Sequence, residues 1–401
     1  MVRQLDQPSD YRLASPRPER NESLLPGGAN FCGYLRTESG VGGSARGYIR
    51  ALKRTGLSLA LLDISDLQTN RSQDDEIRQF HAEHPFDVNL ICADVELHYS
   101  ILSHFGEDFF KDRYNVGLWA WELPRFPKKW FDRFAYYDEI WVPSAFIADS
   151  LSSISPIPVI RMPPALTLPA TGSRECGRQR LNLSDDEFLF LFAFDFHSHI
   201  ERKNPAAAIA AFRRAFSPGD PARLVLKCVN GDSNPQGFRQ LQQLARGAQI
   251  EICDGYWTAE EIRDLTAACD AYLSLHRSEG LGLTITDAMA SGKPVIATGW
   301  SGNTDFMNVN NSYPVRCELV HIDQSVGPYS AGETWAEPSI EHAAECMRAV
   351  YEDRASASAR GRAAQRDIET LYSESAVAQR ISQRLETIGF RRRWPQFQRL
   401  G

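Results

Sequence analysis

The stretch that decides the fold runs from Ser274 to Ala297 and reads SLHRSEGLGLTITDAMASGKPVIA. Its apolar ends predict buried strands at 271–275 and 294–297, and its centre predicts a helix at 283–290. The loop at Glu279-Gly280-Leu281-Gly282 joins the first strand to this helix. Glycines let an anion approach the backbone, and a helix N-terminus carries a partial positive charge. The stretch therefore predicts an anion-binding loop in an α/β unit.

The same alternation of strands and helices extends along the chain in both directions. We predict strands at 30–35, 59–63, 88–92, 115–121, 139–143, 159–162, 188–194, 224–229 and 249–253. We predict further helices at 44–53, 205–216, 236–246 and 259–268. Buried strands that alternate with helices form parallel sheets covered on both faces.

The chain is too long for one ordinary hydrophobic core, and a Pro- and Gly-rich boundary lies at 162–174. We therefore expect a polar tail at 1–26, two doubly wound Rossmann-like domains at 27–168 and 169–372, and a terminal segment at 373–401.

The charge of the chain limits its partners. It has 44 Lys and Arg against 51 Asp and Glu, a formal net charge of -7. Such a chain lacks the dense basic field that binds nucleic acid. Its longest apolar runs are far below the roughly 20 residues that span a bilayer. We expect a soluble, cytoplasmic protein without a nucleic-acid partner.

Two cations follow the predicted strand at 188–194. The loop from Asp195 to Pro205 carries Arg202 and Lys203 directly before a helix. Ligands of parallel sheets bind at the carboxyl ends of the strands, and paired cations there suit phosphate. The alternative is an ordinary exposed pair, and we expect Lys203 to face solvent.

His197 and His199 lack a third metal ligand, and the chain has no Asp-x-Asp triplet, so no metal site is predicted.

Two acids accompany the glycine loop. Glu279 lies in the loop, where it can hold sugar hydroxyls. Asp287 lies one helical turn inside the following helix, on a face from which it can reach a ribose. The alternative is a capping carboxylate and an ordinary helix residue.

These two segments together resemble a known family. The run from Ser274 to Ala297, with an acid eight residues after Glu279, is similar to the Glu-x7-Glu signature of retaining glycosyltransferases of family 4. Asp195-Phe196 with Glu201-Arg202-Lys203-Asn204-Pro205 is similar to that family's diphosphate-binding segment. The resemblance implies the GT-B architecture, in which two Rossmann-like domains face a central cleft and the last helix crosses back to the first domain.

The resemblance also implies a reaction. The co-substrate would be a nucleotide-diphosphate sugar, with no other cofactor and no metal, and the anomeric configuration would be retained. The acceptor would be a saccharide, glycolipid or glycoprotein, in cell-surface polysaccharide synthesis. An enzyme that acts on a lipid-linked acceptor would sit peripherally at the inner face of the membrane.

Residue roles follow from the same resemblance. Arg202 and Lys203 would neutralise the diphosphate, Glu279 would hold donor hydroxyls, and Asp287, one methylene shorter than the family's usual Glu, would bind the ribose. Backbone contacts to the base would lie around Tyr256. Backbone amides would bind phosphate at Gly280, Leu281, Gly282, Leu283 and Thr284.

A second glycine-rich loop, at 37–47, leaves an alternative open. Gly40-x-Gly42-x-x-Ala45, with Asp63 at the next strand end, also fits a dinucleotide-binding fingerprint. An NAD(P)-dependent oxidoreductase is therefore one alternative, and a non-catalytic nucleotide-sugar-binding protein is another. In the resembled family a similar loop, here Gly42, Gly43 and Ser44, faces the donor phosphates or the acceptor.

The first domain offers three more candidates. Trp121 and Glu122 follow a strand, where an indole can stack on a sugar and a carboxylate can bind hydroxyls. A buried Trp pair, Trp119 and Trp121, is the alternative. His98 begins a helix after another strand, and with Glu122 and Glu279 it is a catalytic candidate. The basic and aromatic residues at 390–397 predict a solvated helix end, or a contact with an anionic membrane surface.

Overall fold

A computed structural model describes residues 24–166 and 172–393, with side chains placed up to residue 389. The predicted tail at 1–26 therefore lies outside the described residues except for its last three. The basic and aromatic side chains at 390–397 also lie outside them.

The first domain contains a sheet of six parallel strands in the order β2-β1-β3-β4-β5-β6. Its strands are β1 Gly28–Gly33, β2 Ser58–Asp63, β3 Val88–Cys92, β4 Tyr114–Leu118, β5 Glu139–Val142 and β6 Val159–Arg161. Its helices are α1 Gly40–Arg54, α2 His98–Phe105 and α3 Ala145–Ser152. Strands β1, β4 and β5 are buried along their whole length, as expected for a parallel sheet covered on both faces.

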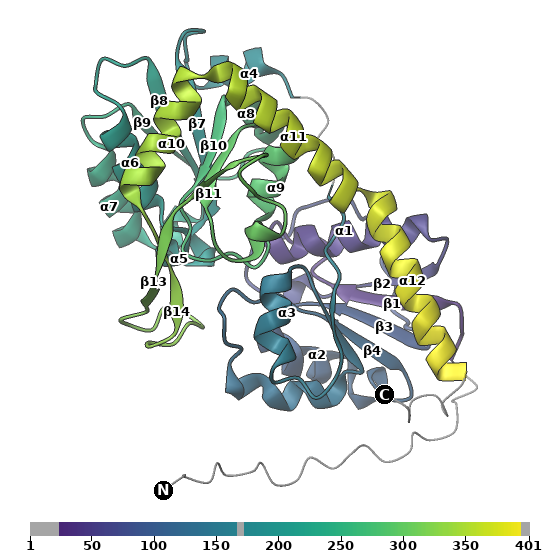
Figure 1. Cartoon of the computed structure of the whole chain (residues 1–401). Helices are drawn as coiled ribbons and strands as arrows, with labels where there is room; N and C mark the ends of the chain where they lie inside the picture. Colours follow the sequence, from purple (N-terminus) through teal and green to yellow (C-terminus); the bar gives the residue numbers. More distant parts are fainter. Residues whose placement is uncertain (1–23, 167–171, 394–401) are drawn as a thin grey trace, which may run out of the picture.

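The second domain repeats this plan with the strand order β12-β11-β10-β7-β8-β9. Its strands are β7 Phe188–Asp195, β8 Ala222–Val229, β9 Ile250–Asp254, β10 Ala271–Ser274, β11 Val295–Thr298 and β12 Tyr313–Val315. Its helices are α4 Arg174–Arg180, α5 Ile200–Lys203, α6 Pro205–Ala215, α7 Pro235–Ala245, α8 Ala259–Ala268, α9 Leu283–Ala290, α10 Ile340–Glu352 and α11 Arg354–Tyr372. The predicted pair of doubly wound domains is confirmed (Figure 1).

Short 3-10 segments connect these elements. They are η1 Ser65–Leu67, η2 Val95–Leu97, η3 Glu107–Phe109, η4 Lys128–Tyr136, η5 Phe196–Ser198, η6 Gly231–Ser233 and η7 Gly302–Asp305. In the described part of the chain, no helix is both long and apolar enough to cross a membrane.

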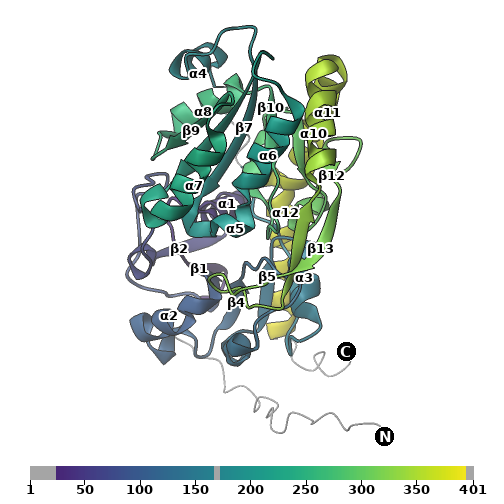
Figure 2. The ribbon, with the colours of Figure 1, turned by 90° about the vertical axis from the view of Figure 1, so that its left-hand side faces the viewer.

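A β-hairpin that the sequence did not predict projects from the second domain toward the first (Figures 1 and 2). Its antiparallel strands are β13 Cys317–His321 and β14 Thr334–Pro338, and we call residues 317–338 the arm. Ile322, Tyr329 and Trp335 of the arm are buried in the same hydrophobic cluster as Trp119 and Trp121 of the first domain. The arm therefore joins the two domains through apolar packing.

The last helix, α12 Glu374–Arg393, runs back along the first domain and packs on α1 (Figure 1). Its Arg384 pairs with Glu139 of β5, whose side chain is fully buried, with 3.1 Å between Arg384 Nε and Glu139 Oε1. Glu139 also accepts hydrogen bonds from Tyr114 and from the Trp141 indole. A buried charge is tolerable because it is paired and fully hydrogen-bonded.

The predicted glycine-rich loop at 37–47 is only partly a loop. Helix α1 already begins at Gly40, because Ser39 caps it by accepting a hydrogen bond from the Gly42 amide at 3.2 Å. Gly42, Gly43 and Ser44 therefore lie within the first five residues of α1. Ser is one of the residues preferred at an N-cap, because its side-chain oxygen can accept a hydrogen bond from an amide of the first turn.

The two domains also meet at α3. The Asp305 carboxylate of η7 accepts a hydrogen bond from the Ala145 amide at 2.8 Å and pairs with Arg161 at 3.0 Å. The hydroxyl of Ser144, the N-cap of α3, donates to the Gly280 carbonyl at 2.6 Å. A Cβ at residue 280 would lie 2.9 Å from the Trp121 carbonyl oxygen, so only glycine permits this close approach. The predicted anion-binding loop thus lies at the domain interface.

Candidate functional site

The loops after β7 and β10 lie side by side, because these strands are neighbours where the strand order of the second sheet reverses. Such a reversal is the usual ligand site of an open parallel sheet. The Arg277 amide donates to the Arg202 carbonyl, and Arg202 Nη1 donates to the Ser278 carbonyl, each at 2.8 Å. The two predicted segments therefore form one structural unit.

Both cations of this unit contact Glu279. Lys203 Nζ lies 2.5 Å and Arg202 Nη1 3.4 Å from Glu279 Oε1. Burial alone would raise the pKa of Glu279, but the Lys203 and Arg202 cations outweigh it and hold the pKa at about 2. The expectation that Lys203 faces solvent was wrong. Its side chain is 14% exposed, because α5 turns it inward onto Glu279.

The group keeps binding capacity for an anion. Two cations face one carboxylate, which leaves one net positive charge. The buried Arg202 Nε and Asn204 Nδ2 have no hydrogen-bond partner among the described residues. The loop that carries Glu279 leads into helix α9, whose N-cap Gly282 has a φ of +92°, and no side chain from the described part of the chain caps its first turn. A helix N-terminus next to excess positive charge favours phosphate.

Two residues that support the glycine loop, Ser301 and His276, were not predicted from the sequence. The Ser301 hydroxyl, in the loop after β11, accepts a hydrogen bond from the Glu279 amide at 2.9 Å. His276 is fully buried between Ser274 and Asn303, and burial lowers its pKa to about 4. Ser301 could have been predicted, because Ser301-Gly302-Asn303 also follows a predicted strand, at 294–297.

The first turn of α1 faces the start of α9. A methyl group placed at Gly43 would lie 3.8 Å from the Leu283 side chain. Gly43 therefore lies against Leu283 at the start of α9, whereas a methyl group at Gly42 would meet the Thr37 carbonyl of its own domain. The Asp287 side chain is solvent-exposed. Partial desolvation by its neighbours raises the pKa of its carboxyl, against the opposing effect of Arg50 on α1.

A loop of the first domain reaches Tyr256. The Arg71 guanidinium lies 4.6 Å from the centre of the Tyr256 ring, and the Tyr256 hydroxyl donates to Asn230 at 3.1 Å. The neighbouring Asn70 is 2.6 Å from His197 Nδ1. The predicted base-binding region is thus contacted from both domains, and His197 has a partner in the first domain.

Glu122 joins the site, whereas the Trp121 ring does not. Glu122 Oε2 accepts a hydrogen bond from the Tyr329 hydroxyl at 3.0 Å, and its carbonyl accepts one from Ser278, beside Glu279. The Trp121 side chain is 4% exposed and packs against Trp130 and Tyr329. The prediction that Trp121 stacks on a sugar is therefore wrong. The residues after β4 turn into an aromatic cluster, as the buried-pair alternative proposed.

His98 lies away from these residues. It is 1% exposed, its Nδ1 lies 3.1 Å from the Tyr137 hydroxyl, and its ring packs on Tyr136 and Phe110. Burial lowers its pKa to about 4. Within the described residues, no hydrogen bond joins it to Glu122 or Glu279. The structure thus places this catalytic candidate in the aromatic core of the first domain.

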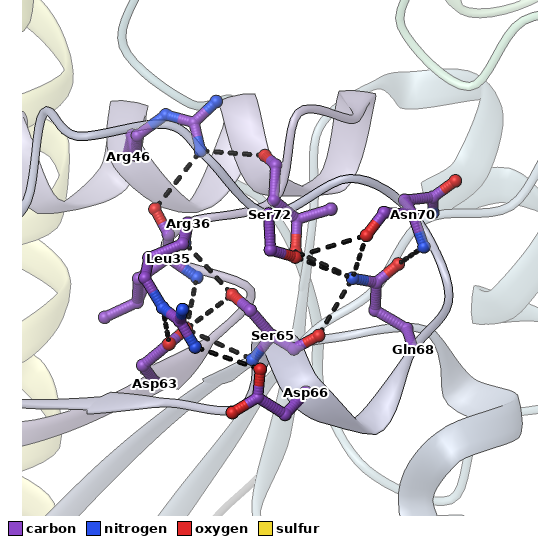
Figure 3. A network of polar contacts seen from close by, with 10 residues as sticks. Leu35, Arg36, Arg46, Asp63, Ser65, Asp66, Gln68, Asn70 and Ser72 are labelled. Carbon is purple, nitrogen blue, oxygen red and sulfur yellow. Dashed lines mark hydrogen bonds and ion pairs between the residues drawn. The ribbon is translucent and has the colours of Figure 1, made fainter. Parts of the chain in front are cut away.

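Asp63, the acid of the dinucleotide-binding alternative, already has partners within the first domain (Figure 3). Asp63 Oδ2 pairs with Arg36 Nε at 2.5 Å, and Oδ1 accepts hydrogen bonds from the Leu35 amide and from Ser65. A ribose would have to displace these bonds, which disfavours the oxidoreductase alternative.

Across residues 24–166 and 172–393, no cluster of three or more His, Cys, Asp or Glu could hold a metal.

Comparisons with known proteins concern the second domain and the fold. The family of glycosyl transferases group 1 matches residues 188–318. No curated protein matches the chain. Sucrose-phosphate synthase from Thermosynechococcus elongatus superposes with a TM-score of 0.67 at 14% identity, over 90% of this chain and 98% of that one.

Two further solved structures are similar over almost their whole lengths. HepE from Anabaena, in complex with UDP-glucose, has a TM-score of 0.65 at 13% identity, over 90% of this chain and 99% of that one. A glycosyltransferase from Rickettsia africae has a TM-score of 0.62 at 13% identity, over 91% and 99%. The second domain is therefore a glycosyl transferases group 1 domain, and the chain is a glycosyltransferase with the two-domain GT-B fold.

Proposed function

We propose that the chain is a metal-independent, retaining glycosyltransferase that moves a sugar from a nucleotide-diphosphate sugar to a saccharide or glycoconjugate acceptor. One observation carries the proposal. Arg202, Lys203 and Glu279 converge at the uncapped start of α9, at the strand-order reversal of a glycosyl transferases group 1 domain.

The geometry suits the charge that develops in this reaction. When the bond between the sugar C1 and the phosphate oxygen breaks, its electrons stay on the departing diphosphate. Arg202, Lys203 and the α9 amides supply fixed positive charge at that point, the task that a divalent metal performs elsewhere. The acceptor oxygen then bonds to C1 from the face that the diphosphate leaves, and its hydroxyl proton passes to the departing phosphate oxygen.

Three residues give the proposed position of each part of the donor. Asp287 lies inside α9, Glu279 lies in the loop before it, and Tyr256 follows β9 and is contacted by Arg71. We propose that the ribose binds at Asp287, the base near Tyr256 and the sugar hydroxyls at Glu279. The UDP-glucose complex of HepE makes UDP sugars the first donors to test. A role in cell-surface polysaccharide synthesis belongs to the same proposal.

The test is a thermal-melting screen of UDP, GDP, ADP and TDP sugars, followed by turnover with and without EDTA. We expect one nucleotide class to raise the melting temperature and EDTA to leave turnover unchanged. Loss of turnover in EDTA would contradict metal independence. Stabilisation by NAD and by no nucleotide sugar would revive the oxidoreductase alternative, and donor binding without turnover would favour a non-catalytic binding protein.

A further inference from the structure

The arm lies outside the part of the chain that the family match explains. Residues 188–318 match the glycosyl transferases group 1 family, and this match ends inside β13. The arm also belongs to neither six-stranded sheet. The contacts of the arm are therefore the evidence for its function.

The base of the arm is held by the loop that carries Glu279. Arg277 Nε pairs with Glu337 at 2.6 Å, and its guanidinium lies 5.3 Å from the centre of the Trp335 ring. The Ala336 amide donates to the Arg277 carbonyl at 3.0 Å. The arm is thus fixed relative to Glu279, two residues farther along the same loop.

The tip of the arm rests on the loop that carries Arg202. Val326 and Tyr329 exchange backbone hydrogen bonds at 2.9 and 3.0 Å, which closes a tight turn. In this turn Gly327 has a φ of +54°, and a Cβ on it would lie 2.1 Å from the His199 ring. Only glycine allows this contact, so the turn delivers Tyr329 to a defined place.

Tyr329 is 3% exposed, and its ring lies 5.6 Å from that of Trp121 and 5.5 Å from that of His199. Its hydroxyl donates to Glu122 Oε2 at 3.0 Å. A phenol has one proton to donate, so it holds one carboxylate oxygen. Ser278 holds the carbonyl of the same residue. Glu122, a residue of the first domain, is therefore oriented by two hydroxyls of the second domain.

We propose that Tyr329 is a positioning residue that orients Glu122 to bind the acceptor. Tyr329 holds the Oε2 atom of Glu122. The other carboxylate oxygen, Oε1, then accepts a hydrogen bond from a hydroxyl of a polyhydroxylated acceptor. Because Tyr329 and Ser278 belong to the domain that binds the donor, this orientation is complete only when the two domains are in contact. The inference rests on the proposed function.

The experiment is a double-mutant cycle of Tyr329→Phe and Glu122→Gln. The wild-type protein is first screened for its donor, and transfer from that donor to a panel of methyl glycosides then identifies an acceptor. Tyr329→Phe removes one hydroxyl and keeps the packed ring. The control is Tyr48→Phe, which removes a buried hydroxyl that donates to the Met162 carbonyl outside the site.

For Tyr329→Phe we expect kcat/KM for the acceptor to fall at least tenfold. The dissociation constant of UDP and the rate of donor hydrolysis should stay within twofold of wild type. The double variant should be no slower than Glu122→Gln, because both changes disable one interaction. Tyr48→Phe should lose similar thermal stability and keep its acceptor kinetics. Gly327→Ala should reproduce the acceptor defect by displacing the turn.

Unchanged acceptor kinetics in Tyr329→Phe, or additive effects of the two substitutions, would overturn the inference. An equal loss of UDP binding would also overturn it, because it would show a general structural role for the arm. Failure of the wild-type protein to transfer a sugar from any nucleotide sugar would instead overturn the proposed function. The wild-type activity is therefore measured before any variant is made.

Discussion

The Lys203 ammonium lies 2.5 Å from Oε1 of Glu279, and the Arg202 guanidinium contacts the same oxygen at 3.4 Å. The carboxylate therefore already neutralises part of the charge that we assign to the diphosphate. Any diphosphate that binds these cations has to compete with Glu279 for them. Glu279 then affects donor affinity and sugar binding in opposite directions.

Glu279→Gln should bind UDP and inorganic pyrophosphate more tightly than wild type, by about tenfold or ~1.4 kcal/mol. The neutral amide no longer competes for the cations. Transfer should fall sharply, and the melting temperature without ligand should drop, because two buried cations lose their counter-charge. Isothermal titration calorimetry measures the affinities. Weaker UDP binding in this variant would refute the competition argument.

Lys203→Met should weaken UDP binding at least tenfold while the apolar part of the side chain still packs. One charged hydrogen bond is worth roughly 1.5–3 kcal/mol. Because Lys203 is largely buried, we also expect a lower melting temperature, unlike a change at an exposed lysine. The control is Lys53→Met, at the end of α1. Equal UDP affinity in the Lys203 variant and in wild type would remove Lys203 from the donor site.

His98→Phe tests the histidine that the structure places in the aromatic core. Its folded pKa of about 4 lies below the ordinary 6.5, so the unfolded chain binds the proton first. Its contribution to stability should therefore fall as the pH drops from 6.5 toward 4, by about 2 kcal/mol at pH 5. The variant should show a smaller loss of stability between pH 7 and pH 5 than wild type. Equal losses would contradict this assignment, and abolished transfer in a folded variant would restore His98 as a catalytic candidate.

Arg384→Met should lower the free energy of unfolding by about 3–5 kcal/mol, because Glu139 keeps its buried charge without its main partner. Urea denaturation followed by tryptophan fluorescence measures the change. Arg362→Met is the matched control, since Arg362 is exposed and bonds Ser358 on its own helix. Equal effects of the two substitutions would show that the Glu139 pair does not anchor α12.

The parts that the sequence predicted well are local. Each buried strand is followed by its own loop, so the order of strands and the position of Arg202, Lys203 and Glu279 after β7 and β10 could be read from neighbouring residues. The rule that ligands bind at strand ends then placed these loops together. The distances could not be predicted, and Lys203 was therefore expected in solvent.

The errors concern contacts between distant residues. Trp121 and His98 follow strand ends as Arg202 and Glu279 do, but only the three-dimensional packing shows that aromatic rings surround them. Tyr329 and Glu122 are separated by 207 residues. The arm is an isolated antiparallel hairpin outside the alternation of strands and helices, so no repeating pattern indicated it.

The return of α12 to the first domain means that the chain passes between the domains twice. The Leu166 amide donates to the Tyr372 carbonyl at 2.9 Å, so the outgoing and returning crossings lie one hydrogen bond apart. Two crossings this close together mean that the backbone itself connects the domains at one place. The other contacts between the domains described above, such as Arg71 on Tyr256 and Tyr329 on Glu122, are noncovalent. On the proposed function, nucleotide and acceptor would enter where these contacts break.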